Sequence, residues 1–139
     1  MNVKASDVMI TQLVTGTPDL RLYQALALME QKHIRHLPLI DAENGLLVGI
    51  LTDRDVKRHM SAAFRTDHEK AEDRASMLVT VADVMTRDPF SVRPETPLKD
   101  VVQAMIEHKF GAVPVVDAGR KPVGIITSID LLRLLLPHV

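Results

Sequence analysis

The chain contains one unit of sequence twice, and this internal repeat limits its possible folds more than any other feature. Asp7-Val8-Met9 recurs as Asp83-Val84-Met85, an offset of 83 − 7 = 76. One residue is deleted further along, so the offset then becomes 75. The other matches at these offsets are Pro18 with Pro94, Leu22 with Leu98, Met29 with Met105, Leu37–Asp41 with Val113–Asp117, Gly49–Thr52 with Gly124–Thr127, and Asp55 with Asp130. The chain is therefore two copies of a unit of roughly sixty residues.

Each copy predicts the element order β-α-β-β-α. Apolar residues spaced i, i+3, i+4, i+7 from Leu22 to Met29 and from Leu98 to Met105 predict an amphipathic helix in each copy. We expect Thr96 to be the N-cap of the second of these helices, with Pro97 as its first residue. An extended segment precedes each helix, around residues 13–15 and 90–92. The strand pairs expected after the helices are Leu37–Ile40 with Leu46–Leu51, and Val113–Val116 with Val123–Ile126; the last helix of each copy begins at Thr52 or Thr127.

The domain organisation follows from the size of the unit. A unit this small, with so short a sheet, cannot bury both of its faces alone. We therefore expect an α/β (α+β) module in which the copies, residues 1–60 and 80–139, pack together with pseudo-twofold symmetry. The charged stretch 61–79 is predicted to be a solvated linker.

Composition excludes several function classes. The formal net charge is −1, which gives no field that favours nucleic acid or anionic lipid. The chain has no cysteine, so thiolate chemistry and disulfides are excluded. There is no signal-peptide pattern and no apolar run long enough to span a membrane, so a cytoplasmic protein is expected. The histidines and acids form no convincing metal set, and no catalytic motif assembles, so we expect neither a metal nor an enzyme.

The segment most suited to ligand binding is the strand-to-helix junction Gly-x-x-Thr-x-x-Asp, present as Gly49–Asp55 and Gly124–Asp130. Glycine lets a ligand or a neighbouring strand come close to the backbone. The threonine lies at a helix N-terminus, which favours anions, and the aspartate three residues later can accept hydrogen bonds from a sugar diol. A structural interpretation stays open, because Thr-x-x-Asp is also a capping box.

The complete pattern, Asp-Val-Met, then apolar-Pro-apolar-apolar-Asp, then Gly-Ile-Ile-Thr-x-x-Asp, resembles the CBS domain, and its duplication resembles the paired arrangement called a Bateman module. The resemblance implies sheet-to-sheet packing of the copies, two clefts, and adenosine ligands such as AMP, ADP, ATP or S-adenosylmethionine. It implies that Asp55 and Asp130 bind ribose, and that Thr52 and Thr127 face ribose or phosphate.

The resemblance also assigns the base slot to the residues that lead into the proline. These are Arg35, His36, Leu37 and Pro38 in the first copy, and Gly111, Ala112, Val113 and Pro114 in the second. The residue after Asp-Val-Met helps to line this slot; it is Thr86 in the second copy but Ile10 in the first. Because Gly111 and Ala112 leave room for a flat base, we favour the site around Asp130 for adenine. Arg54 is a candidate phosphate ligand, although a surface ion pair with Asp53 is an alternative.

The resulting functional hypothesis is a non-catalytic module that senses an adenosine nucleotide and requires no cofactor. We expect it to form a homodimer through the apolar stripe Leu131, Leu132, Leu134 and Leu135, and to signal to an unidentified effector protein. The alternatives are a ligand-free dimeric scaffold and, less favoured, a small enzyme.

Overall fold

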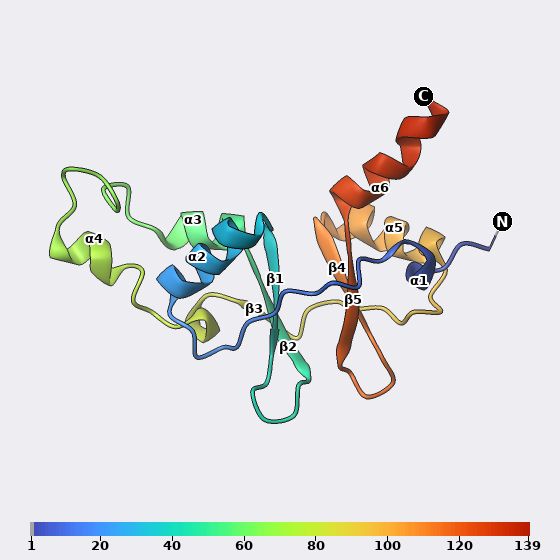
Figure 1. The fold of residues 1–139 in the computed structure, drawn as a ribbon, viewed down its shortest axis with the longest axis horizontal. Coiled ribbons are helices and arrows are strands. Elements are labelled where there is room, and N and C mark those ends of the chain that lie inside the picture. Colours follow the sequence, from blue (N-terminus) through green and yellow to red (C-terminus); the bar gives the residue numbers. More distant parts are fainter. Residues whose placement is uncertain (1) are drawn as a thin grey trace. The chain divides into compact units, whose positions relative to one another are not determined.

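The computed structural model describes residues 2–139, which fall into two compact units (Figure 1). One is Val14–Asp88, here called the 14–88 unit. The other, here called the 89–139 unit, combines Pro89–Val139 with residues 2–13. The elements are α1 (Ala5–Val8), α2 (Leu22–Lys32), β1 (His36–Ile40), β2 (Leu47–Thr52), α3 (Asp53–His59), α4 (Ala71–Ala75), η1 (Val81–Asp83), β3 (Thr86–Arg87), α5 (Leu98–His108), β4 (Ala112–Val116), β5 (Pro122–Thr127), α6 (Ser128–Leu135) and η2 (Leu136–His138).

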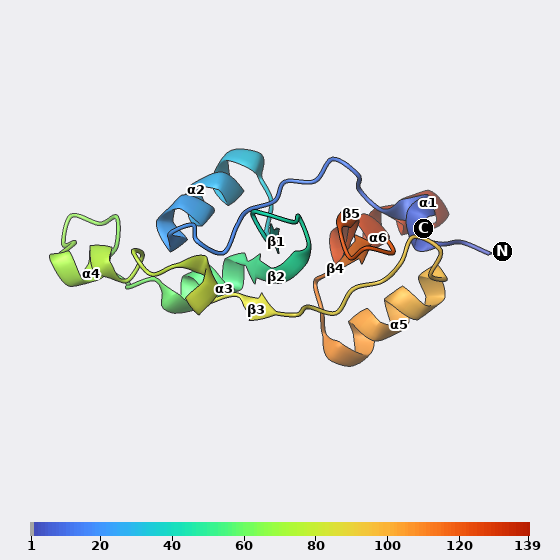
Figure 2. The ribbon, with the colours of Figure 1, turned by 90° about the horizontal axis from the view of Figure 1, so that it is seen from below.

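The 14–88 unit is built on an antiparallel sheet in the order β1-β2-β3. The middle residues of β1 are buried. Helices α2 and α3 lie beside β1 and β2 (Figure 2), and they contribute Leu22, Met29 and Val56 to the same core. Met77, Val81 and Met85, which come from the end of the linker and the start of the second copy, complete this core. The linker therefore does more than bridge the copies, because Met77 is buried in the 14–88 unit.

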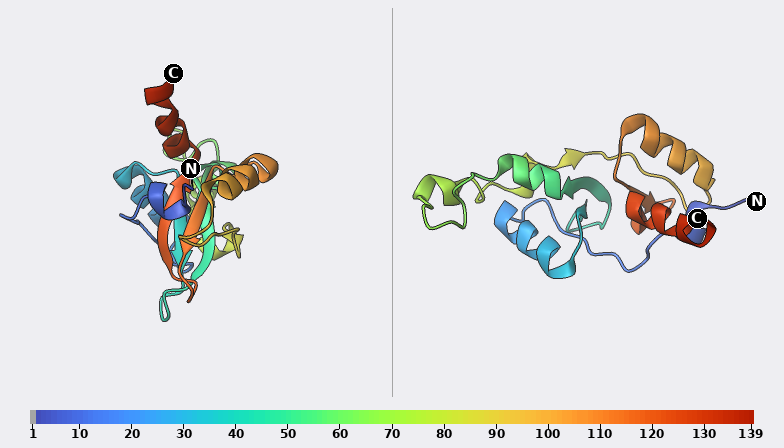
Figure 3. Two further views of the ribbon diagram at one scale, coloured as in Figure 1. Left: turned by 90° about the vertical axis from the view of Figure 1, so that its right-hand side faces the viewer. Right: turned by 90° about the horizontal axis from the view of Figure 1, so that it is seen from above.

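The 89–139 unit has the antiparallel pair β4-β5, with α5 against β4 and α1 against β5 (Figure 3). Its core contains Val101, Val113, Val115 and Ile126, together with Ala5 from the N-terminal segment. Ile10 forms an isolated bridge to Ile125 of β5, in which each N–H donates to the other residue's carbonyl, with N···O distances of 2.9 and 3.0 Å. The N-terminal segment is thus an integral part of this unit.

Each unit contains a segment from the other sequence copy, and the two exchanges match bond for bond. The N–H of Leu98, the first residue of α5, donates to the Val3 carbonyl (2.8 Å); at the offset of 76, the Leu22 N–H of α2 donates to the Val79 carbonyl (2.8 Å). The bonds from Ala5 N–H to the Thr96 carbonyl and from Val81 N–H to the Leu20 carbonyl form a second matched pair (both 2.8 Å). These carbonyls satisfy N–H groups that a helix start leaves without a partner. The boundaries expected from the repeat, 1–60 and 80–139, therefore do not coincide with the packed units.

The predicted elements otherwise form largely where the sequence places them. Both long helices, both strand pairs and the N-caps Thr52 and Thr127 are confirmed. The extended segments before the helices are single bridges, Gly16 to Leu39 and Val92 to Val115.

The predicted Thr96 cap is wrong. Pro97 is the N-cap, and the Thr96 hydroxyl instead accepts a hydrogen bond from Arg93 N–H (3.0 Å). The α5 start does not need this side chain, because Val3 supplies an acceptor for its first N–H group.

Candidate functional site

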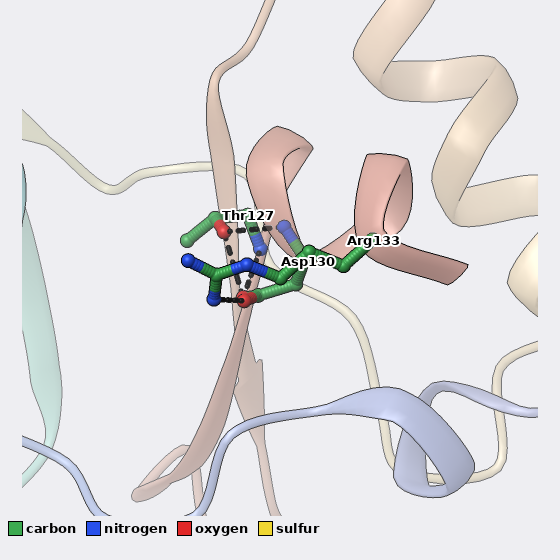
Figure 4. Close-up of polar contacts among 3 residues, drawn as sticks. All are labelled: Thr127, Asp130 and Arg133. Carbon is green, nitrogen blue, oxygen red and sulfur yellow. Dashed lines mark hydrogen bonds and ion pairs between the residues drawn. The ribbon is translucent and has the colours of Figure 1, made fainter. Parts of the chain in front are cut away.

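The junction between β5 and α6 holds the Thr127–Asp130 pair in a capping box (Figure 4). Asp130 N–H donates to Thr127 Oγ1 (3.2 Å), while the Thr127 hydroxyl donates to Asp130 Oδ2 (2.7 Å). A longer bond of 3.4 Å runs from Thr127 N–H to the same oxygen. The structural interpretation of this motif is therefore confirmed. It fixes the carboxylate beside the first turn of α6.

The capping bonds leave acceptor capacity on the Asp130 carboxylate. Only Oδ2 accepts hydrogen bonds within residues 2–139, and Oδ1 lies 3.7 Å from Arg133 Nη1. That ion pair is weak, because the Arg133 side chain is 71% exposed. The Asp130 side chain is 18% exposed, and each carboxylate oxygen has two lone pairs. The capping role and the binding of a diol are therefore compatible.

The β2–α3 junction of the 14–88 unit repeats this geometry. Thr52 N–H donates to Asp55 Oδ2 (2.9 Å), and Asp55 N–H donates to Thr52 Oγ1 (3.1 Å). The first N–H group of each helix also has a matched acceptor: Asp53 N–H donates to the Arg35 carbonyl and Ser128 N–H to the Gly111 carbonyl, both at 2.9 Å. These bonds bring the residues of the predicted base slot against the start of the helix in each unit.

The predicted base-slot residues lie directly across the strand pair from the threonines. Ala112 is the backbone partner of Thr127, and His36 is the partner of Thr52. The next side chains point elsewhere: Leu37 and Val113 are fully buried in the core clusters of their units, and Pro38 and Pro114 are buried too. Their side chains therefore support the strands, and the positions nearest each helix start are Arg35 and His36 in one unit and Gly111 and Ala112 in the other.

His36 is half-buried, and burial lowers the pKa of its imidazole. The carboxylates of Asp53 and Asp55 oppose this shift, while the Arg35 guanidinium adds to it. The neutral imidazole is therefore the favoured form at pH 7. A neutral ring is a flat donor and acceptor, which suits a wall of a binding site.

The structure separates Thr86 from Asp130 and Ile10 from Asp55, although the sequence hypothesis grouped each of these residues with the aspartate of its own copy. Thr86 pairs with Ile50 on β2, so it belongs to the 14–88 unit with Thr52 and Asp55. Ile10 pairs with Ile125 on β5, in the 89–139 unit with Asp130. The reason is the segment exchange, which moves the residue after each Asp-Val-Met into the unit of the other copy.

Arg54 is exposed and forms no ion pair with a carboxylate within residues 2–139. Asp53, the alternative partner considered for it, lies 3.8 Å from Lys57 Nζ instead. The guanidinium of Arg54 is therefore available to an anion.

Sequence reasoning missed two methionines beside the junctions. A Cβ on Gly124 would lie 2.5 Å from Met9 Sδ, and a Cβ on Gly49 would lie 2.5 Å from Met85 Sδ. The glycines thus admit the methionine of each exchanged Asp-Val-Met segment. The duplicated pattern contains both methionines and both glycines, but it does not indicate which glycine each methionine contacts.

Within residues 2–139, no group of three or more histidine or acidic side chains is placed to hold a metal ion. No helix in this part of the chain has the length and apolar character needed to cross a membrane.

Comparison with known proteins gives a consistent family match. The model of the CBS domain matches residues 5–62 and 81–137. The CBS domain-containing protein YhcV of Bacillus subtilis is 33% identical over 125 residues, which cover 90% of this chain and 80% of that protein. Among curated enzymes that match at 29 to 32% identity, including the homoserine O-acetyltransferase of Methanohalobium evestigatum, the chain spans only about a quarter of the length.

Solved structures with the same fold include two that contain adenosine compounds. The CBS domain pair of protein MJ0100, in complex with 5′-methylthioadenosine and S-adenosyl-L-methionine, aligns with a TM-score of 0.82 at 28% identity and covers 100% of both chains. CBSX2, a protein of Arabidopsis thaliana, in complex with AMP, aligns with a TM-score of 0.78 at 32% identity and covers 97% of both chains.

Proposed function

The chain belongs to the CBS domain family, and on this premise we propose that it is a non-catalytic regulatory module that binds adenosine nucleotides at its two strand-to-helix junctions. The observation that carries the proposal is the matched pair of capped aspartates, Asp55 and Asp130. Each is fixed by its own helix start and keeps an oxygen, Oδ1, that accepts no hydrogen bond within residues 2–139. Full-length similarity to CBS pairs solved with AMP and with methylthioadenosine supports the ligand class.

The two junctions differ in chemistry, and we propose that they prefer different adenosine compounds. Apart from the Arg133 guanidinium, which lies 3.7 Å from Asp130 Oδ1, the positions around Asp130 are small or apolar: Gly111, Ala112, Ile129 and the exchanged Ile10. This junction suits adenine and a compound without phosphate, such as methylthioadenosine.

Around Asp55 the corresponding positions hold Arg35, His36, Arg54 and the exchanged Thr86. Two guanidinium groups favour a phosphorylated compound such as AMP or ATP. His36 would then form a polar wall of the site, not a general base.

The first experiment is isothermal titration calorimetry with AMP, ATP and 5′-methylthioadenosine, supported by thermal unfolding. A ligand at 100 times its Kd adds about 2.7 kcal/mol to the free energy of unfolding, which raises Tm by roughly 5 to 10 °C. Asp130→Ala is expected to weaken methylthioadenosine binding about 10- to 100-fold, because a charged hydrogen-bond acceptor is lost. Arg54→Ala is expected to weaken AMP and to leave methylthioadenosine unchanged.

Asp7→Ala is the matched control. Asp7 is also the third residue of a helix and accepts its N-cap N–H (Lys4, 2.8 Å), but it lies outside the proposed sites. If Asp7→Ala weakens binding as much as Asp130→Ala does, the effect reflects stability and the ribose role of Asp130 is refuted. No heat and no Tm shift with any of these compounds at millimolar concentration would favour the scaffold alternative.

We further propose that the module acts in the cytoplasm, self-associates and passes its state to an effector protein by a shift in conformational population. The support for self-association is the C-terminal helix. Leu132, Leu134, Leu135 and Leu136 are all exposed, whereas Leu131, which the sequence grouped with them, packs against the core of the 89–139 unit. Several exposed apolar side chains on one helix are typical of an interaction surface.

A further inference from the structure

One face of the 14–88 unit is strongly cationic. Arg54, Lys57 and Arg58 of α3 are all exposed, and their spacing of three and four residues makes them neighbours on the helix surface. Arg35 is exposed too and lies beside the first turn of this helix, because its carbonyl accepts the Asp53 N–H (2.9 Å). Like charges four residues apart destabilise a helix slightly, so the stability of α3 does not explain the pair of arginines.

The acids of the chain leave three of these cations without a partner. Asp53, which precedes Arg54 in the sequence, lies 3.8 Å from Lys57 Nζ. Arg35, Arg54 and Arg58 form no ion pair within residues 2–139, and together they are here called the arginine face. Their guanidinium groups are therefore available to an anion from outside the chain.

The internal repeat shows that this charge belongs to the first copy alone. At the offsets of the repeat, the counterparts of the arginine face in the 89–139 unit are Gly111, Ile129 and Arg133. Only Arg133 is charged, and its guanidinium lies 3.7 Å from Asp130 Oδ1. Since both units share the strand-to-helix geometry, that geometry does not require the cations. They indicate a binding role for this surface of the 14–88 unit.

The charge of the rest of the chain limits what the arginine face binds. The formal net charge is −1, so the residues outside the face carry −1 − 3 = −4. Nucleic acid and an anionic bilayer present negative charge over an area wider than one face, so they would also meet this negative remainder. A short segment rich in aspartate or glutamate meets only the guanidinium groups, whose planar fork matches a carboxylate. Charge complementarity therefore favours an acidic segment of a partner protein.

The arginine face overlaps the nucleotide site proposed at the Asp55 junction. Arg35 and Arg54 are the two guanidinium groups assigned there to phosphate. Arg58 lies four residues, or about 6 Å, further along α3. A single phosphate at the junction thus engages the first two arginines and leaves Arg58 to the acidic segment alone.

We propose that the arginine face docks an acidic segment of the effector protein, and that a phosphorylated nucleotide at the Asp55 junction releases it. Phosphate and carboxylate groups compete for Arg35 and Arg54, whereas a compound without phosphate leaves the segment docked. The docking stands on the face itself, and the release rests on the proposed function of the Asp55 junction. Nucleotide binding is thereby converted into the loss of a partner without any chemical step.

The docking is tested with a fluorescein-labelled oligoglutamate peptide, whose Kd for the full chain is measured by fluorescence anisotropy at low salt. Arg58→Glu is expected to weaken peptide binding about tenfold or more, because an attraction is replaced by a repulsion. Lys121→Glu is the control, because it changes the net charge equally at an exposed position of the 89–139 unit, and it should leave the Kd unchanged. Equal weakening by both variants would mean that the peptide senses only net charge, and it would overturn the docking. A wild-type chain that does not bind the peptide would overturn it as well.

Competition tests the release. Saturating AMP is expected to raise the Kd of the peptide about fivefold or more, and methylthioadenosine to leave it unchanged. By linkage, the peptide must weaken AMP binding by the same factor, which calorimetry measures. If AMP binds in calorimetry and the peptide Kd stays constant, the release is refuted while the proposed function stands. If AMP does not bind at all, the proposed function of this junction fails, and Arg58→Glu still decides the docking.

Other occupants of the arginine face would appear in parallel measurements. Single-stranded DNA or phosphatidylglycerol vesicles that bind more tightly than the peptide, and that lose binding in Arg58→Glu, would replace the acidic segment as the occupant. A sedimentation coefficient that falls in Arg58→Glu without any peptide would mean that a second copy of the chain covers the face. Either result would overturn the proposal. The Arg58 side chain is exposed, so the variant is expected to fold, and circular dichroism checks this.

Discussion

The contact between Gly124 and Met9 offers a quantitative test of the segment exchange. In Gly124→Ala, the new Cβ would lie 2.5 Å from Met9 Sδ, 2.8 Å from Cγ and 3.0 Å from Cβ. The last two atoms are close to the Met9 backbone, so a rotation of the distal side chain cannot remove the clash. Overpacking of this kind costs roughly 1–3 kcal/mol. Alanine returns up to about 1 kcal/mol through the entropy of the unfolded chain. We therefore expect a net loss of about 1–2 kcal/mol in the free energy of unfolding.

The assay is a double-mutant cycle in guanidinium chloride with Gly124→Ala, Met9→Ala and the combined variant. Met9→Ala removes Sδ and Cγ and leaves only the Cβ contact at 3.0 Å, so Gly124→Ala should cost much less in that background, with a coupling energy of about 1 kcal/mol. If Gly124→Ala costs the same with and without the Met9 side chain, the two residues do not touch and the exchange at this position is refuted. The Gly49 and Met85 pair is the internal replicate in the 14–88 unit.

Three further predictions concern other contacts. Ala5→Asp should lower the free energy of unfolding by several kcal/mol, because the Ala5 side chain is fully buried. It should also lower hydrogen-exchange protection in β4 and β5, whereas the matched Val81→Asp should lower it in β1 and β2. Burial holds the pKa of His36 below its ordinary value of 6.5, so the unfolded chain binds the proton more readily than the folded chain. Urea titrations should therefore show that the free energy of unfolding falls as the pH drops through 6.5 towards the folded-state pKa. In His36→Gln this fall should be less steep. Glu30→Gln should cost under about 1 kcal/mol in urea, and less in 1 M salt, because both partners of the Arg65 pair are half exposed.

The features that local chemistry determines could be predicted from the sequence. Helical spacing placed α2 and α5, and the Thr-x-x-Asp pattern placed the caps at Thr52 and Thr127, because a capping box involves only residues three apart. The position of Thr96 illustrates the limit. Threonine followed by proline is a favourable helix start, yet α5 begins one residue later, where the Leu98 N–H donates to the Val3 carbonyl. No local pattern reveals an acceptor from so distant a segment.

The segment exchange could not be predicted, and the repeat itself is the reason. Both copies carry the methionine and the glycine, so Met9 fits the sequence equally well against Gly49 or Gly124. The sequence pattern is therefore equally compatible with packing within a copy and with packing between copies. Only the structure selects the second arrangement, in which Met9 lies on Gly124 and Met85 on Gly49.

That selection decides which residues accompany each aspartate, and hence the chemistry proposed for each site. Packing within a copy would have placed Thr86 with Asp130 and Ile10 with Asp55, giving each junction a mixture of polar and apolar neighbours. The exchange places Ile10 beside β5, in the unit with Gly111 and Ala112, and Thr86 beside β2, in the unit with the arginines. The exchanged residue thereby adds an apolar neighbour to the junction with the small base-slot residues, and a polar neighbour to the junction with Arg35 and Arg54. On the function proposed above, two similar repeats acquire different ligand preferences through the position of one exchanged residue as well as through their own substitutions.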